Sequence, residues 1–221
     1  MAQEMKRRFS LESDFMNYSV NDLIYGYLSY KSTFDSESKE RYIYVKTVSS
    51  LKSTMAAMIQ KTPRTVTNNI NAMIDRGLLM LIEKDGQSAY LLTEGIGRYQ
   101  LVNYDILWYL LQTRSKIAIK VYVYLLNKYL WKQQTHENYI FTIDELSIAM
   151  GYAASSTTVQ PMVSVLLDSF AREGLLKWRE VVDTKEINGK MVPVTRRELI
   201  SIIERKEQWP QVTVERVYAN N

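Results

Sequence analysis

The sequence predicts a mainly α-helical chain with small β-hairpins, an α+β fold built from two copies of one domain type. Apolar residues recur at helical spacing in several segments that polar stretches separate. Two further segments contain the turn signals of β-hairpins, Lys84-Asp85-Gly86 and Asn188-Gly189. A constant spacing of 97 residues aligns the two halves without a gap, and the matched pairs include Tyr25 with Tyr122, Tyr42 with Tyr139, Val66 with Val163, and Gly77 with Gly174.

In the first half, helix and strand patterns follow one another in a definite order. The predicted elements are a helix over 21–32, a polar loop over 33–40, a strand over 42–45, a helix over 48–59, a helix from Pro63 to Arg76, and strands over 78–83 and 88–93. Thr62 is expected to cap the third helix, because Pro63 lacks only an N–H that would be unpaired there. Gly77 is expected to end that helix.

The second half repeats this plan with longer elements. The predicted elements are a long helix over 105–131 that also joins the domains, a strand over 139–142, a helix over 143–150, a polar turn over 153–158, a helix with Pro161 in its first turn, and a long hairpin centred on Asn188-Gly189. The hairpin register places Glu180 opposite Arg197 and Arg179 opposite Glu198. Pro193 cannot donate to the ladder, so it is expected at an edge or a bulge.

Helix, strand, two helices around a turn, and a hairpin make up the winged helix-turn-helix, whose last helix enters the major groove of DNA. The sequence therefore predicts two such domains in tandem, over 18–98 and 99–205. A basic N-terminal arm over 1–17 and a C-terminal tail over 206–221 are expected to flank them. The cations of the arm, Lys6-Arg7-Arg8, form either a solvated tail or a segment that reaches the minor groove.

The third helix of the first domain carries the candidate site. Its apolar stripe is expected to pack inward and consists of Val66, Ile70, Met73 and Ile74. Its opposite face is expected to contact DNA, with Arg64, Asn68 and Asn71 at the centre and Thr65 and Thr67 at the flanks. Arginine can bind guanine through two hydrogen bonds, and asparagine can bind adenine in the same way. Lys61 and Thr62, at the start of the helix, suit a phosphate.

A solvated polar helix face is the plainer interpretation of this pattern. However, the central polar face contains neither glutamate nor lysine, the residues that favour an idle helix surface. Residues 41–76 also hold six cations and one anion, a net charge of +5. Both observations favour a DNA-binding role.

The second domain has a different charge pattern. Residues 140–173 hold four acids and one arginine, a net charge of −3, and phosphate binding dominates affinity for DNA. Its third helix is expected to bury Val163, Leu167, Phe170 and Ala171 and to expose Ser164, Val165, Asp168 and Arg172. Two interpretations stay open: DNA contacts from the hairpins, or a surface for a second copy or another protein. The hairpin cations that would contact DNA are Lys84 in the first domain and Lys185, Lys190, Arg196 and Arg197 in the second.

Several classes of function lack the residues that they need. The chain has no cysteine and one histidine, His136, which excludes thiolate metal sites and sites built from several imidazoles. No glycine-rich phosphate loop and no long apolar run occurs. We therefore expect a non-enzymatic protein without metal or cofactor, located in the cytoplasm with the nucleoid or a plasmid, and no membrane partner.

Two segments resemble known families. The string SLKSTMAAMIQKTPRTVTNNINAMIDRGLL, residues 50–79, looks like many bacterial winged-helix regulators. Residues 115–178, with SKIAIKVYVYLLNKYLW, NYIFTIDELSIAMGY and VLLDSFAREGLLKW, resemble the winged-helix domain of plasmid and phage replication initiators of the RepA N-terminal type. The polar stretch in the second domain is shorter than in that pattern.

The resemblance implies a sequence-specific double-stranded-DNA-binding protein, a replication initiator that binds origin repeats. The alternatives are a transcriptional regulator of a mobile element and a winged-helix docking module of a replication or segregation complex. The implied partners are duplex DNA, a second copy of the chain, and replication or transcription proteins.

Overall fold

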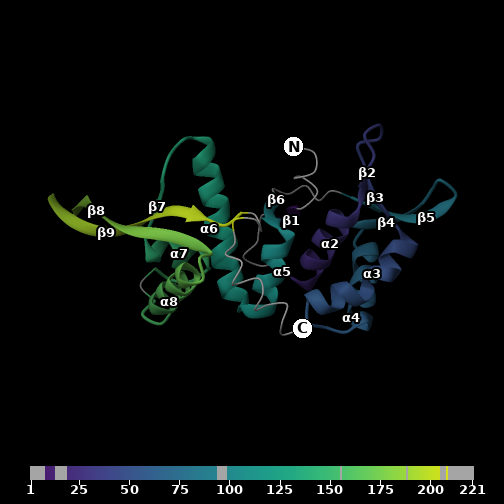
Figure 1. The fold of residues 1–221 in the computed structure, drawn as a ribbon, viewed down its shortest axis with the longest axis horizontal. Coiled ribbons are helices and arrows are strands. Elements are labelled where there is room, and N and C mark those ends of the chain that lie inside the picture. The colour runs from purple at the N-terminus through teal and green to yellow at the C-terminus, as the bar shows by residue number, and fades with distance from the viewer. Residues whose placement is uncertain are drawn as a thin grey trace. The chain divides into compact units, whose positions relative to one another are not determined.

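The structure, a computed structural model, describes residues 8–12, 19–93, 99–154, 156–187, 189–204 and 208. The chain combines helices with small antiparallel sheets, which confirms the mixed helix-and-strand class (Figure 1). It divides into two compact units, unit 1 over Met1–Thr113 and unit 2 over Arg114–Asn221. The division therefore lies between residues 113 and 114, rather than between 98 and 99 as the sequence predicts.

Unit 1 contains four helices and six strands within the described residues. In chain order they are β1 (Arg8–Glu12), α2 (Val20–Lys31), β2 (Thr33–Phe34), β3 (Arg41–Tyr44), α3 (Val45–Met58), α4 (Pro63–Asp75), β4 (Leu79–Lys84), β5 (Gln87–Leu92), β6 (Tyr99–Asn103) and α5 (Tyr104–Thr113). Two expectations change. The predicted loop over 33–40 contains the short strand β2, and the predicted N-terminal arm contains β1, which pairs with β6.

Unit 2 has three helices and three strands in the part of the chain that the structure describes. In chain order they are α6 (Lys116–Gln134), β7 (Tyr139–Phe141), α7 (Ile143–Ala149), α8 (Val159–Arg172), β8 (Leu176–Ile187) and β9 (Lys190–Ile202). The predicted tail over 206–221 lies outside the described residues apart from Gln208.

The two units share one sheet topology. The strands β3, β5 and β4 lie in that order in unit 1, and β7, β9 and β8 lie in the same order in unit 2. The strand that precedes the two consecutive helices, β3 in unit 1 and β7 in unit 2, therefore pairs with the second strand of the hairpin, β5 or β9.

Matching hydrogen bonds extend this likeness to single residues. The Tyr25 hydroxyl donates to the Thr93 carbonyl oxygen, and the Tyr122 hydroxyl donates to the Ile203 carbonyl oxygen. Each acceptor directly follows the last strand of its hairpin. The same two acceptor residues donate their N–H groups to the carbonyl oxygens of Leu78 and Leu175, which are again 97 residues apart. These contacts support a duplicated structural unit.

The spacing of 97 residues fails in the matched strands β3 and β7. Ile43 is 3% exposed, but Ile140, the residue matched to it by the ungapped alignment, is 43% exposed. The buried counterpart is Phe141, which directly precedes the N-cap Thr142 as Ile43 directly precedes the N-cap Tyr44. Because side chains alternate along a strand, a shift of one residue exchanges the buried and exposed faces.

The predicted long helix over 105–131 is wrong, because the chain breaks into α5 and α6. Ser115 caps the start of α6 by accepting a hydrogen bond from the Ala118 N–H. The end of α5 is hydrogen-bonded to the end of α3 and to the turn that follows it: Gln112 donates to the Ala57 carbonyl oxygen, and Gln60 donates to that of Leu111. These contacts place α5 with unit 1.

The hairpin of β8 and β9 is the longest sheet element of the described chain and extends past the rest of unit 2 (Figure 1). Its register confirms the predicted opposition of Arg179 with Glu198 and of Glu180 with Arg197. Only residues 197–199 of β9 also pair with β7. Pro193 lies opposite Thr184 in the part beyond β7, at the edge position that its missing N–H predicts.

Within the described residues, no helix combines the length and the apolar character that crossing a membrane requires.

Candidate nucleic-acid interface

The α4 helix begins and ends where the sequence predicts. Thr62 is the N-cap and accepts a hydrogen bond from the Thr65 N–H, and Pro63 is the first helical residue. At the other end Gly77 has a φ of 71°, and its N–H donates to the Ile74 carbonyl oxygen. Glycine adopts this left-handed conformation without a steric cost, which is why the helix stops there.

The inner face of α4 anchors the helix against α2 and α3. Val66, Ile70 and Met73 are buried, as predicted, whereas Ile74 is half-buried at the edge of the stripe. Full burial of such a side chain stabilises the fold by about 1.5–3 kcal/mol. The orientation of the outer face is therefore determined by this packing.

The outer face of α4 presents its polar side chains to solvent. Arg64, Asn68 and Asn71 are exposed, and none of them has a hydrogen-bond or ion-pair partner in the part of the chain that the structure describes. Their spacing of four and three residues along the helix places them on one face. An arginine and two amides are thus open to solvent on one face of the helix.

The threonines around this face have internal partners. The Thr67 hydroxyl donates to the Pro63 carbonyl oxygen, and the hydroxyls of Thr62 and Thr65 lie 3.1 Å apart. Both Thr65 and Thr67 are half-buried. They support the first turn, and the exposed Thr62 and Lys61 stand at the helix start, where N–H groups and the helix dipole attract anions.

The hairpin cation of unit 1 is paired. The Lys84 Nζ atom lies 2.7 Å from Asp35 Oδ2 and 5.4 Å from the centre of the Tyr42 ring. The hydrogen bond from Lys84, with the N–H groups of Glu37 and Ser38, lowers the pKa of Asp35 to about 2. The same carboxylate raises the pKa of Lys84. The charge that sequence reasoning assigned to DNA therefore already has a carboxylate beside it.

The described hairpin cations of unit 2 are also engaged. Arg196 lies 3.4 Å from the carboxylate of Asp183. Arg197 donates to the Ser164 hydroxyl at 3.2 Å, and its guanidinium lies 4.8 Å from the centre of the Trp178 ring. The side chains of the other two predicted hairpin cations, Lys185 and Lys190, lie outside the described residues.

The α8 helix of unit 2 has the same place in its unit as α4 but a different outer face. At the spacing of 97 residues, Pro161 takes the place of Arg64, Val165 that of Asn68, and Asp168 that of Asn71. All three are exposed, while Val163, Leu167 and Phe170 are buried as predicted. The predicted burial of Ala171 is only partial.

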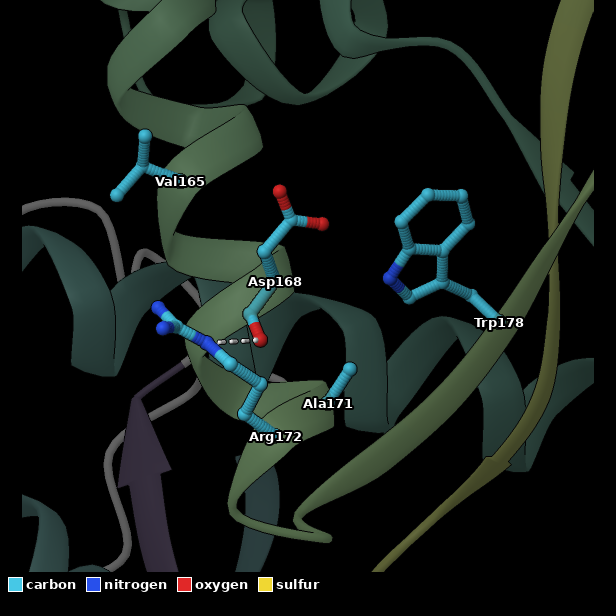
Figure 2. Close-up of a pocket in the computed structure, with 5 residues that line it drawn as sticks. All are labelled: Val165, Asp168, Ala171, Arg172 and Trp178. Atoms are coloured by element: carbon cyan, nitrogen blue, oxygen red, sulfur yellow. Dashed lines mark hydrogen bonds between the residues drawn. The ribbon is translucent and has the colours of Figure 1, made fainter.

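An open hollow of about 650 Å³ lies beside this outer face, and its lining residues are Val165, Asp168, Ala171, Arg172 and Trp178 (Figure 2). Sequence reasoning placed three of these side chains outward on the helix but did not find the hollow, because Trp178 reaches it from β8. A sign of the hollow in the sequence was Val165, an apolar residue on the predicted outer face of the helix.

No protein-family model, curated protein or solved structure matches the chain.

Proposed function

We propose that the chain is a sequence-specific double-stranded-DNA-binding protein in which unit 1 binds base edges through the outer face of α4. One observation carries the proposal: Arg64, Asn68 and Asn71 are exposed together, without internal partners among the described residues, on a helix fixed by its buried side. Side chains of these types make the two-point hydrogen bonds that distinguish guanine and adenine in the major groove.

The arrangement of each unit supports a winged helix-turn-helix assignment. Helix, strand, two helices and an antiparallel hairpin occur in that order twice, with one strand order in both sheets. In that architecture the helix before the hairpin is the one inserted into the groove, and α4 holds this position in unit 1.

Electrostatics favours unit 1 over unit 2 for this role. Lys61 and Arg64 are exposed near the start of α4, and the residues over 41–76 carry a net charge of +5. The corresponding region of unit 2, residues 140–173, carries −3. Because neutralisation of phosphates supplies most of the non-specific affinity for DNA, the basic helix-turn-helix of unit 1 is better suited to bind DNA than that of unit 2.

Within this proposal the biological role is replication initiation at the repeats of a plasmid or phage origin, which the resemblance of residues 115–178 favours. A regulator bound to an operator of a mobile element would use the same helix. The location of the target sequence, near an origin or near a promoter, distinguishes the two roles.

The direct test selects duplexes from a randomised library with the purified chain and then measures affinity for the enriched sequence. We expect Arg64→Ala/Asn68→Ala to weaken specific binding by about 1–3 kcal/mol for each lost two-point contact. Lys61→Ala should weaken all duplexes alike and reduce the slope of log K against log salt by about one.

Arg76→Ala is the matched control, because Arg76 is exposed at the far end of the same helix and its removal costs the same charge. It should retain the preference for the selected sequence. Enrichment of no sequence, or equal losses for Arg76→Ala and the double variant, would show that α4 does not read bases.

A further inference from the structure

The outer face of α8 combines exposed apolar surface with two charges that are not paired with each other. Val165 is 61% exposed, and the hollow beside it is closed on one side by Trp178 of β8 (Figure 2). Burial of such surface is favourable at about 25 cal/mol per Å². The corresponding place in unit 1 holds Asn68, so the apolar side chain is particular to unit 2.

The two charges come from one face of the helix, and their side chains point in different directions (Figure 2). The carboxylate of Asp168 points toward Trp178, whereas the Arg172 side chain points away from it, with Nε donating to the Asp168 carbonyl oxygen at 3.4 Å (Figure 2). Neither the carboxylate nor the terminal guanidinium nitrogens have an ion-pair partner among the described residues. An acid and a base four residues apart on a helix face commonly pair with each other.

Two nearby arginines are already committed. Arg197 is held between the Ser164 hydroxyl and the Trp178 ring, and Arg114 binds Ser169 and Glu173. Both arginines are therefore occupied, and among the described residues on this outer face Asp168 and Arg172 are the charges without an ion-pair partner.

We propose that this face of α8 is a self-association surface, on which a second copy of the chain docks about a two-fold axis. A two-fold interface brings the same patch of each copy together, so that residue i meets residue j and residue j meets residue i. An acid and a base one helical turn apart satisfy this condition: with the two α8 helices antiparallel, Asp168 of each copy faces Arg172 of the other. Val165 and the hollow beside Trp178 supply apolar surface beside these charge pairs.

The alternatives fit the chemistry of this face less well. A phosphate backbone would meet the unpaired carboxylate of Asp168 in a region of net charge −3. A purely basic or purely acidic protein partner would pair with only one of the two charges. A second copy pairs with both.

Charge exchange tests the proposal by sedimentation equilibrium of the full chain without DNA. We expect the wild-type chain to dimerise, and Asp168→Lys and Arg172→Glu each to raise the dimer dissociation constant at least tenfold, because each places like charges opposite each other. Mixing the two variants should restore association, since the introduced lysine of one copy then faces the introduced glutamate of the other, and the unchanged Arg172 faces the unchanged Asp168. Val165→Asp, which replaces exposed apolar surface with a charge, should also raise the dimer dissociation constant.

Three results would overturn the proposal. The first is a wild-type chain that stays monomeric up to about 100 μM, where even a dimer of micromolar affinity would form. The second is a dimer that none of the variants affects. The third is a monomeric chain in which Val165→Asp weakens binding to DNA or to another protein, because the face would then serve that occupant. Circular dichroism confirms folding, and the substituted side chains are exposed.

This proposal does not rest on DNA binding by α4. Arg64→Ala/Asn68→Ala should leave the dimer intact, so that failure of one proposal is distinguishable from failure of the other. If both hold, the assembly carries two α4 helices and the selected DNA should contain two half-sites.

Discussion

The α4 helix of unit 1 and the α8 helix of unit 2 have matching inner faces and contrasting outer faces. Val66 and Val163 are both fully buried, as are Met73 and Phe170. On the outside, an asparagine in one helix is a valine in the other, and a second asparagine is an aspartate. Packing constrains what points inward, whereas a side chain that points to solvent can change without loss of the fold. The comparison separates the part of the repeat that maintains structure from the part that is free to differ between the two units.

The largest expected effect concerns the shared inner faces. Phe170→Ala should lower the free energy of unfolding of unit 2 by about 3–5 kcal/mol, and Met73→Ala that of unit 1 by about 2–5 kcal/mol. Each substitution leaves a cavity in a core where the original side chain is fully buried. Hydrogen exchange of individual amides at increasing urea concentration shows which unit has lost free energy of unfolding. Losses below about 1 kcal/mol would contradict equivalent packing of the two helices.

The next prediction concerns a variant in which the outer face of α4 carries the residues found on α8. Asn68→Val/Asn71→Asp gives α4 the pattern of α8 and should remove about 1–3 kcal/mol of discrimination per lost two-point contact, without unfolding the chain. The measurement is affinity for the selected duplex against a scrambled one.

The reciprocal variant, Val165→Asn/Asp168→Asn, is the control and should leave affinity for a duplex with a single half-site unchanged. A loss from the control as large as that from the α4 variant would mean that the two outer faces do not differ in function.

A smaller difference is expected between the two matched tyrosines. Tyr122 is fully buried, so Tyr122→Phe leaves the Ile203 carbonyl oxygen without its donor and should cost about 1–3 kcal/mol. Tyr25 is half-buried, and water can replace its hydroxyl at the Thr93 carbonyl oxygen, so Tyr25→Phe should cost about 0.5–1.5 kcal/mol. Denaturant midpoints measure the stability lost by each variant. A larger loss for Tyr25→Phe than for Tyr122→Phe would contradict the prediction from burial.

The smallest expected effect is a pH dependence of stability in unit 1, where Lys84 of the hairpin pairs with Asp35. The pKa of Asp35 is lowered to about 2 by Lys84, so this pair contributes its stability above the ordinary aspartate pKa of about 3.9 and loses it as pH falls toward 2. In Lys84→Ala the pKa of Asp35 should rise toward its ordinary value, which carboxyl-carbon NMR titration measures. Arg196→Ala, in the other hairpin, should not change that pKa. An unchanged titration in Lys84→Ala would show that backbone N–H groups alone hold the carboxylate.

Local signals explain what the sequence could predict. The start and end of α4 follow from Thr62-Pro63 and Gly77, and the register of the long hairpin follows from Asn188-Gly189. In each case the deciding residues lie within a few positions of the feature, and so does the apolar stripe that orients the outer face of α4.

Contacts between distant residues explain what the sequence could not predict. The break before α6 interrupts an apolar pattern without a proline or glycine, and α5 is hydrogen-bonded to the end of α3 and to the turn that follows it through Gln60 and Gln112. Likewise, Lys84 is paired with the carboxylate of Asp35, which lies far from it along the chain. The hollow is lined by residues of α8 together with Trp178 of β8. Spacing in the sequence carries no information on such partners.

Pro193 has a consequence for the behaviour of the chain at high concentration. A two-residue turn closes on a hydrogen-bonded pair, and such pairs alternate along an antiparallel ladder, so Pro193 and Thr184 both direct their backbone groups away from the hairpin. Proline has no N–H to offer, and the N–H of Thr184 donates to the Asp183 carboxylate at 2.8 Å. At this pair of residues, neither edge strand of the hairpin offers a free N–H group to another strand. At this level the long hairpin is therefore a poorer template for the strand-by-strand growth that leads to fibrils.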